Sequence, residues 1–139
     1  MSTALPTPDQ LNDQIFPFAK LLGISVVHVE ADLIEAVMPV RNDLCTSGPL
    51  AHGGALMAFA DTLGGIGTFV NLPDDASGTT TIESKTNFLR AGAVGTTLKG
   101  RCQPLHRGRT TQVWQTTISS EEGKPVAIVT QTQMVLRAA

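Results

Sequence analysis

The stretch from Pro49 to Val70 carries one histidine, a glycine pair and one carboxylate in a run that is otherwise apolar or small. His52-Gly53-Gly54 stands near its start, and Asp61 follows eight positions after Gly53. The first turn of a helix has unpaired backbone N–H groups, and glycine lets a substrate approach them closely. A carboxylate in a helix that is apolar all round is expected to be buried, and therefore paired or hydrogen-bonded. Amide donors for an oxyanion and a carboxylate that activates water or attacks a carbonyl are two parts of a hydrolytic site.

The spacing of these groups has a geometric consequence. Gly53 and Asp61 are eight residues apart, which is about 12 Å along one helix at a rise of roughly 1.5 Å per residue. Two such groups on one chain cannot hold the same carbonyl. Two antiparallel helices across a two-fold axis would bring the start of one helix near the middle of the other. The spacing therefore predicts a composite site, present twice in a homodimer.

Each candidate also has a structural interpretation. Asp61 can be a satisfied polar residue that caps a loop of a partner, and His52 can be a structural hydrogen-bonding group rather than a catalyst. Gly54 is a second candidate amide donor. The later glycines Gly64, Gly65 and Gly67 favour close packing of strands on the helix over a direct function. No other metal-binding residue types lie at ligand spacing, so we expect no metal site.

The remaining sequence predicts the elements that position this helix. Residues 8–22 have helical spacing, although Pro17 is expected to distort or end the helix, and residues 50–70 form the central helix. The segments that are predicted to be strands are 24–30, 33–40, 79–89, 96–106, 110–120 and 126–136. The connections between the last four are too short for parallel crossovers. The order predicts an α+β fold in which an antiparallel sheet wraps around a single apolar helix.

Composition limits the class of protein. The chain has 139 residues and a net charge of −2, which suits a single domain over 1–139 and does not favour nucleic acid as a partner. Residues 1–80 are acidic and residues 81–139 are basic, which fits either a small anionic ligand or charge pairing across the fold. Two cysteines and no basic leader favour the cytoplasm. No uninterrupted apolar stretch predicts a membrane span.

His52-Gly53-Gly54-Ala55, Asp61 and the later Asn87-Phe88-Leu89-Arg90 resemble a hotdog-fold acyl-CoA thioesterase. The branch that the sequence resembles is the PaaI-like group of the 4-hydroxybenzoyl-CoA thioesterase superfamily, and the resemblance covers about residues 15–136. It implies a sheet of five or six strands, a homodimer that is often doubled to a homotetramer, and a site at the subunit interface. It also implies an acyl-CoA substrate and no cofactor, since coenzyme A is part of the substrate.

The resemblance implies roles for single residues. The Gly53 N–H would polarise the thioester carbonyl, and Asp61 of the partner chain would be the nucleophile or general base. Related enzymes often carry Asn or Gln seven residues before the first glycine, where this chain has Thr46, and the nearest amide is Asn42. Thr81 is nearest to the position of a hydroxyl that faces the acid.

Three arginines in predicted turns, Arg90, Arg107 and Arg109, are candidates for the phosphates of coenzyme A, because a guanidinium binds phosphate with two parallel donors. A solvated role in the turns is the alternative for each of them. Met57, Phe59, Phe69, Phe88 and Trp114 belong either to the core or to the wall of an acyl pocket.

Two other functions compete with hydrolysis. A hotdog hydratase or dehydratase would use an acid–base pair, for which His52 and Asp61 are the candidates. The glycine pair directly after His52 and the lack of a second histidine nearby favour hydrolysis. A non-catalytic acyl-CoA-binding protein is the other alternative, and it leaves Asp61 without a role.

Overall fold

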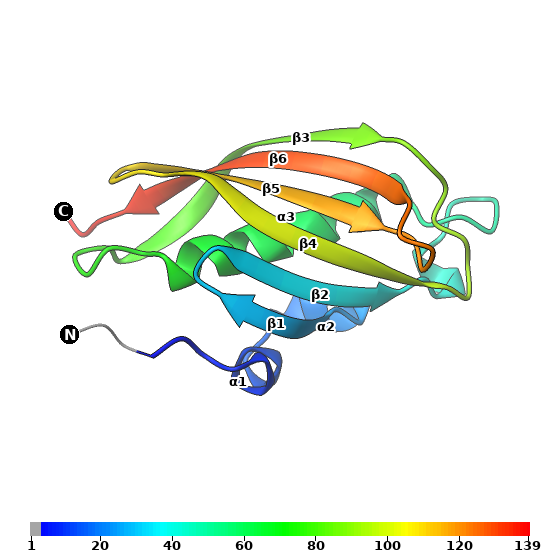
Figure 1. Ribbon diagram of the computed structural model, residues 1–139, viewed down its shortest axis with the longest axis horizontal. Helices are drawn as coiled ribbons and strands as arrows, with labels where there is room; N and C mark the ends of the chain where they lie inside the picture. Colours follow the sequence, from blue (N-terminus) through cyan, green and yellow to red (C-terminus); the bar gives the residue numbers. More distant parts are fainter. Residues whose placement is uncertain (1–3) are drawn as a thin grey trace.

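Six antiparallel strands curve around one long helix in the computed structural model, which describes residues 4–139 (Figure 1). The strand order in the sheet is β1-β2-β4-β5-β6-β3, so β1 and β3 form its edges. The bounds are β1 Ser25–Glu30, β2 Leu33–Pro39, β3 Gly78–Phe88, β4 Thr97–Arg107, β5 Thr111–Ser119 and β6 Pro125–Leu136. Each bound lies within about one residue of the predicted one, well inside the usual disagreement at element ends. The α+β hotdog architecture is confirmed, with six strands.

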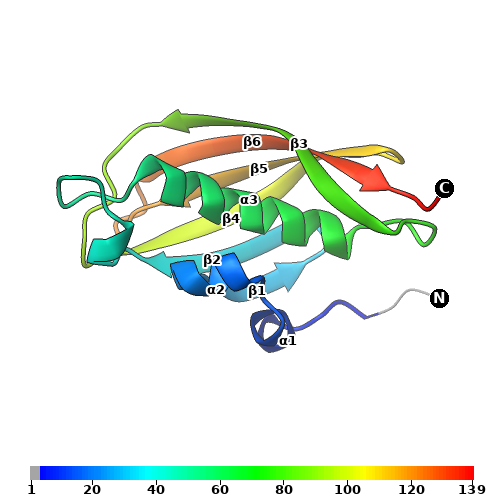
Figure 2. The same cartoon turned by 180° about the vertical axis from the view of Figure 1, so that it is seen from behind.

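Helix α3 (Gly53–Val70) lies across the concave side of the sheet, as the view from behind shows (Figure 2). Among the helices of residues 4–139, α3 is the one that is long and apolar enough to span a membrane, but 56% of it is buried inside the fold. Its sheet-facing side packs on residues such as Trp114, which is fully buried. A Cβ at Gly67 would lie 2.8 Å from the Trp114 ring, closer than side-chain carbons come in a packed core. Gly67 is therefore required for close packing of the helix on β5, as the sequence favours.

The N-terminal segment is interrupted near Pro17, as the sequence predicts. The helical region expected over 8–22 continues after the break, so it forms two helices, α1 (Pro8–Asp13) and α2 (Pro17–Leu22). Pro17 is the first residue of α2, where its missing N–H is no loss, but it disfavours helix at the residue before it. Gly23 ends α2 with φ at 77°, a left-handed conformation that glycine adopts without strain. The break sets α2 against α3 near the middle of the long helix.

Strand β3 contains a one-residue bulge. Thr81 is opposite Gln133 on β6, whereas Glu83 is opposite Thr132, so Ile82 is an extra residue. Side chains alternate between the two faces of a strand, and an extra residue reverses the alternation beyond it. As a result Thr81 before the bulge and Phe88 after it both lie on the side that faces α3.

Candidate active site

The start of α3 presents a backbone donor. His52 is the N-cap, and its Nδ1 accepts a hydrogen bond from the Gly54 N–H at 2.8 Å. Within residues 4–139 the Gly53 N–H has no hydrogen-bond acceptor. The prediction that Gly53 and Gly54 both offer amide donors is therefore corrected, because the cap uses the second one. Gly53 alone has a free N–H in this turn, and His52 has a structural role as the cap.

The end of β3 reaches this turn. The Phe88 ring lies over Gly53, and a Cβ at Gly53 would come within 3.1 Å of it. Phe88 is 54% exposed, so its ring borders the free donor from the outside. The two halves of the predicted motif, His52-Gly53-Gly54 and the segment 87–90, are thus adjacent in space.

Asp61 lies on the side of α3 that faces β3 and β6, next to Thr81 and Gln131. The expectation that it is buried is wrong for the single chain, where it is exposed, because the apolar residues of α3 gather on another face of the helix. Its Oδ1 accepts a hydrogen bond from Thr81 Oγ1 at 2.9 Å and one from Gln131 Nε2 at 3.3 Å. The structure therefore brings Thr81 to the acid, as the family resemblance implies.

A cavity of about 450 Å³ opens beside Asp61. Its wall comes from α2, α3 and the first half of β3, and Asp61 is its only charged side chain in the part of the chain described. The lining residues are Phe16, Phe18, Ala19, Asp61, Thr62, Gly65, Phe69, Thr79, Thr80, Thr81 and Gln133. No group of three or more His, Cys, Asp or Glu that could hold a metal ion occurs within residues 4–139.

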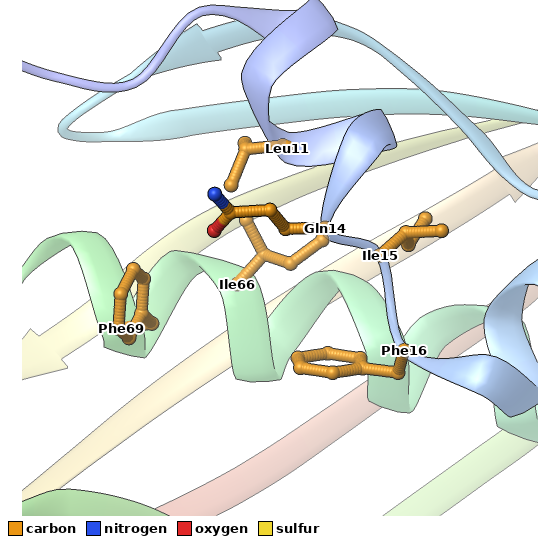
Figure 3. A pocket seen from close by; sticks show the side chains of 6 residues that line it. All are labelled: Leu11, Gln14, Ile15, Phe16, Ile66 and Phe69. Carbon is orange, nitrogen blue, oxygen red and sulfur yellow. The ribbon is translucent and has the colours of Figure 1, made fainter.

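A smaller apolar pocket of about 150 Å³ adjoins this cavity (Figure 3). It lies between α3 and the segment that links α1 to α2. Phe16 and Phe69 line both spaces, so the pocket and the cavity share an apolar wall. The remaining lining residues of the small pocket are Leu11, Gln14, Ile15 and Ile66.

The residues before the helix do not reach Asp61 within one chain. Thr46 is exposed, and its Oγ1 accepts a hydrogen bond from the Gly48 N–H at 3.3 Å. Asn42 begins a single 3-10 turn, η1 (Asn42–Leu44), and is also exposed. Neither lines the cavity beside the acid. Both lie at the same end of α3 as Gly53, because the His52 N–H bonds to the Leu44 carbonyl.

The three arginines are separated. Arg90 Nη1 donates to the Pro125 carbonyl at 3.0 Å, just after the end of β3 that covers Gly53. Arg107 Nη1 lies 3.3 Å from Asn71 Oδ1, at the C-terminal end of α3. Arg109 is exposed in the turn that follows β4. Within one chain, Arg90 and Arg107 cannot therefore bind the same phosphate group.

Two buried glutamines near Asp61 are absent from the sequence-based set of site residues. Gln131 and Gln133 on β6 are each 1% exposed. Gln133 Nε2 donates to Thr81 Oγ1 at 2.6 Å, and Gln131 Nε2 contacts Asp61 directly. Their polarity suggests a solvent-facing position, so the only signal in the sequence is their spacing of two residues on a strand.

The chain matches the family model of the thioesterase superfamily over residues 48–127, a range that includes the start of α3, Asp61 and the end of β3. Among curated proteins, it is 40% identical over 103 residues to the proofreading thioesterase EntH of Cronobacter turicensis. It is 32% identical over 103 residues to the 1,4-dihydroxy-2-naphthoyl-CoA hydrolase of Escherichia coli K12. Each alignment covers 74% of this chain and 74% of the relative.

Solved structures show the same fold. Thioesterase HI1161 of Haemophilus influenzae superposes with a TM-score of 0.89 at 29% identity, covering 96% of this chain and 93% of that one. A mutant of the phenylacetic acid degradation protein PaaI of Thermus thermophilus superposes with a TM-score of 0.80 at 26% identity. That alignment covers 87% of this chain and 100% of the PaaI chain.

A single helix wrapped by a six-stranded antiparallel sheet, with a free amide at its start and a carboxylate in its middle, defines a hotdog-fold thioester hydrolase. The chain belongs to the thioesterase superfamily and is of the PaaI-like type. Membership in this family favours hydrolysis over the two alternatives, hydration of an acyl chain and binding without turnover.

Proposed function

We propose that this protein hydrolyses an acyl-CoA thioester to the free acid and coenzyme A, at a site that two subunits share. The Gly53 N–H of one subunit would bind the thioester oxygen, and Asp61 of the other would act on the carbonyl carbon. The coenzyme A thioester is supported by the relative from Escherichia coli, whose name states hydrolysis of an aroyl-CoA.

The proposal of a shared site rests on one observation. The free N–H of Gly53 and the carboxylate of Asp61 are both accessible in the single chain, yet they are separated by eight residues of one helix. That separation is about 12 Å at roughly 1.5 Å per residue, whereas a reacting carbonyl needs both groups within about 3 Å. A second α3, antiparallel across a two-fold axis, supplies the missing group to each site.

The chemistry follows from the two groups. The N–H stabilises the negative charge that develops on the thioester oxygen when the carbonyl carbon is attacked. Asp61 either attacks that carbon itself, giving an anhydride that water then cleaves, or removes a proton from a water molecule that attacks. In both routes the C–S bond breaks, the sulfur leaves with a proton as coenzyme A thiol, and water supplies the oxygen of the acid.

The exposed surface next to these groups supports a homodimer. Within residues 4–139, β3 is hydrogen-bonded only to β6, so its other edge is open in the single chain. Large apolar side chains are exposed along it and on the outer face of α3, which is unusual for a surface that remains in water. They include Met57 at 40%, Ile82 at 54%, Phe88 at 54% and Leu89 at 50% exposure. We propose that a second copy covers this surface, and that two dimers form a homotetramer.

We assign the acyl group to the cavity beside Asp61 and to the apolar pocket that adjoins it. The phenyl rings of Phe16 and Phe69 line both spaces, and burial of an apolar group there releases water from apolar surface. The two cysteines are free thiols, which agrees with our proposal of a reducing, cytoplasmic location.

The proposal is tested by thiol release from acyl-CoA substrates of different chain length and aromaticity, with Asp61→Asn and Asp74→Asn compared. Asp74 is also an exposed carboxylate, so its variant makes the same change in charge away from the cavity. We expect Asp61→Asn to lower kcat by about 1,000-fold, equivalent to about 4 kcal/mol, and Asp74→Asn to match the parent. An Asp61→Asn enzyme that retains more than about a tenth of the parental kcat, a difference of only about 1.4 kcal/mol, would refute the assignment.

A further inference from the structure

We propose that Gln131 and Gln133, buried on β6 beneath α3, are positioning residues that hold one oxygen of Asp61 and leave the other free to react. The inference rests on the proposed role of Asp61. It concerns two side chains of β6 that act on the carboxylate directly or through Thr81.

A chain of hydrogen bonds leads from β6 to the acid. Gln133 Nε2 donates to Thr81 Oγ1 at 2.6 Å, and Thr81 Oγ1 donates to Asp61 Oδ1 at 2.9 Å. An amide nitrogen can only donate, so the hydroxyl oxygen of Thr81 accepts this bond. Its single hydrogen is then directed at Asp61.

The other end of the Gln133 amide is also fixed. Its Oε1 accepts a hydrogen bond from Thr79 Oγ1 at 3.0 Å. Gln133 therefore sits between two threonines of β3 that lie on the same face before the bulge. The Thr79 hydroxyl also lies 2.9 Å from the Met134 carbonyl, so its one hydrogen is shared between two acceptors, while both polar atoms of the buried amide keep a partner.

Gln131 approaches Asp61 from below the helix. Its Nε2 lies 3.3 Å from Asp61 Oδ1. The amide occupies the space where a Cβ on Gly64 would be, so glycine at that position of α3 allows the approach. The Oε1 of Gln131 is buried and has no hydrogen-bond partner within residues 4–139. A buried amide that satisfies one end and not the other costs stability, and its Nε2 contact with the carboxylate is a functional reason for that cost.

The two glutamines therefore give Asp61 an asymmetric environment. Oδ1 receives donors from Thr81 and Gln131, while Oδ2 has no hydrogen-bond partner among the residues described. Two donors on one oxygen fix the orientation of the carboxylate. The glutamines are almost fully buried and act through Asp61 and Thr81, so they position the carboxylate and take no direct part in the reaction.

The test compares three glutamine variants of the full-length enzyme: Gln131→Met, Gln133→Met and Gln112→Met. Gln112 is a matched control, because it is also 1% exposed and lies opposite Gln133 on β5. Its amide instead bonds to the Asn71 carbonyl and the Trp114 indole. We expect kcat to fall by about tenfold in Gln131→Met and in Gln133→Met, with KM within about twofold of the parent. Gln112→Met should change the stability of the protein but leave kcat and KM as in the parent.

A double-variant cycle separates positioning from general destabilisation. If Gln133 acts through Thr81, then Gln133→Met lowers kcat in the parent but has no further effect in Thr81→Val. Thr81→Ser keeps the hydroxyl and should restore most of the activity lost in Thr81→Val. Thr81→Val also tests the same link should Gln133→Met fail to fold.

The proposal is wrong if both β6 variants keep kcat within about twofold of the parent, if Gln112→Met lowers kcat as much as they do, or if the effects of Thr81→Val and Gln133→Met add. In those cases an inactive Asp61→Asn still supports the proposed function. An active Asp61→Asn enzyme overturns the proposed function itself, and with it the role of the glutamines.

Discussion

The first turn of α3 and the middle of α3 provide their functional groups in opposite ways. At the start, the donor is a backbone N–H, and its surroundings are set by His52 within the same turn. In the middle, Asp61 is held by Thr81, 20 residues away, and by Gln131, 70 residues away. The donor thus depends on local helix geometry, whereas the carboxylate depends on the correct pairing of β3 with β6. Substitutions at the start of α3 are therefore expected to act through the helix turn, and substitutions around Asp61 through the pairing of β3 with β6.

The strongest test of this comparison places one substitution at the start of α3 and one in its middle, in different subunits of a dimer. Asp61→Asn and Gly53→Val homodimers should each be nearly inactive, since every site lacks the carboxylate in the first and has its N–H blocked by the valine side chain in the second. When subunits exchange, half of the dimers are mixed and each has one complete site, so activity should return to about a quarter of the parental value. The measurement is thiol release before and after exchange.

The Gly53→Val subunit must fold for this test. Its added side chain would meet the Phe88 ring, which is half-exposed and able to turn aside. Circular dichroism and light scattering on the homodimer provide the control. No recovery of activity after proven exchange, or full activity in a monomer, contradicts the shared site.

Two adjacent glycines in α3 allow a second test, on stability. A Cβ at Gly64 would overlap the Gln131 amide, whereas a Cβ at Gly65 would meet nothing within 4 Å. Gly64→Ala should lower the free energy of unfolding by about 1–3 kcal/mol, as overpacking does. Gly65→Ala should raise it by up to about 1 kcal/mol, because alanine favours helix. Urea denaturation of both variants measures the difference, and equal effects would contradict the packing of Gln131 against Gly64.

The sequence predicted the first turn of the helix better than its middle. His52-Gly53-Gly54 is a local motif, so the helix start and the donor at Gly53 follow from adjacent residues. The partners of Asp61 depend on which residues of β6 face inward. Polar Gln131 and Gln133 are not expected in a core, and no local pattern shows that a glycine on α3 leaves room for an amide. Burial of Asp61 was also predicted wrongly, because a run of small and apolar residues does not show which face of the helix is left exposed in the single chain.

A smaller effect is expected at the helix cap. His52→Ala removes the acceptor for the Gly54 N–H and should cost about 1 kcal/mol of stability, the usual effect of losing an N-cap. His52→Ser provides a good cap and should recover most of that loss. Thermal unfolding of the two variants measures the cap alone. Any loss of kcat that His52→Ser does not recover would assign a direct catalytic role to the imidazole.

The smallest effect concerns the two thiols. They compare the loop that precedes α3, which holds Cys45, with the core, which holds Cys102. Burial raises the pKa of the Cys102 thiol from 9.0 to about 12, so its reactive thiolate is suppressed in the folded state. Cys45 is partly exposed in the loop before α3. Iodoacetamide at pH 8 should modify Cys45 first, and Cys102 only after unfolding, as peptide mass spectrometry would show. Equal modification rates in the native protein would mean that the core opens as easily as the loop.

The same raised pKa has a consequence for stability. The folded state favours the neutral thiol, so this contribution is complete below about pH 9 and is lost as the pH rises towards 12. Cys102→Ala should therefore lose less stability than the parent on going from pH 8 to pH 10.5, measured by urea denaturation. An identical loss in both proteins would contradict the shift.

The bulge at Ile82 restricts how the length of this chain can vary. Thr81 and Phe88 are seven residues apart, an odd number that would place them on opposite faces of a regular strand. The extra residue reverses the alternation once, so Thr81 and Phe88 lie on the same face. One strand therefore contacts both the Asp61 carboxylate and the start of α3. A single insertion or deletion between these two positions would turn one of them outward, while a change of two residues would keep their orientation but shift the pairing with β6. Length differences that preserve the site are therefore expected in the connections beyond Phe88 and before Gly78. A related sequence that aligns with a single-residue gap within 82–87 is expected to have a different site.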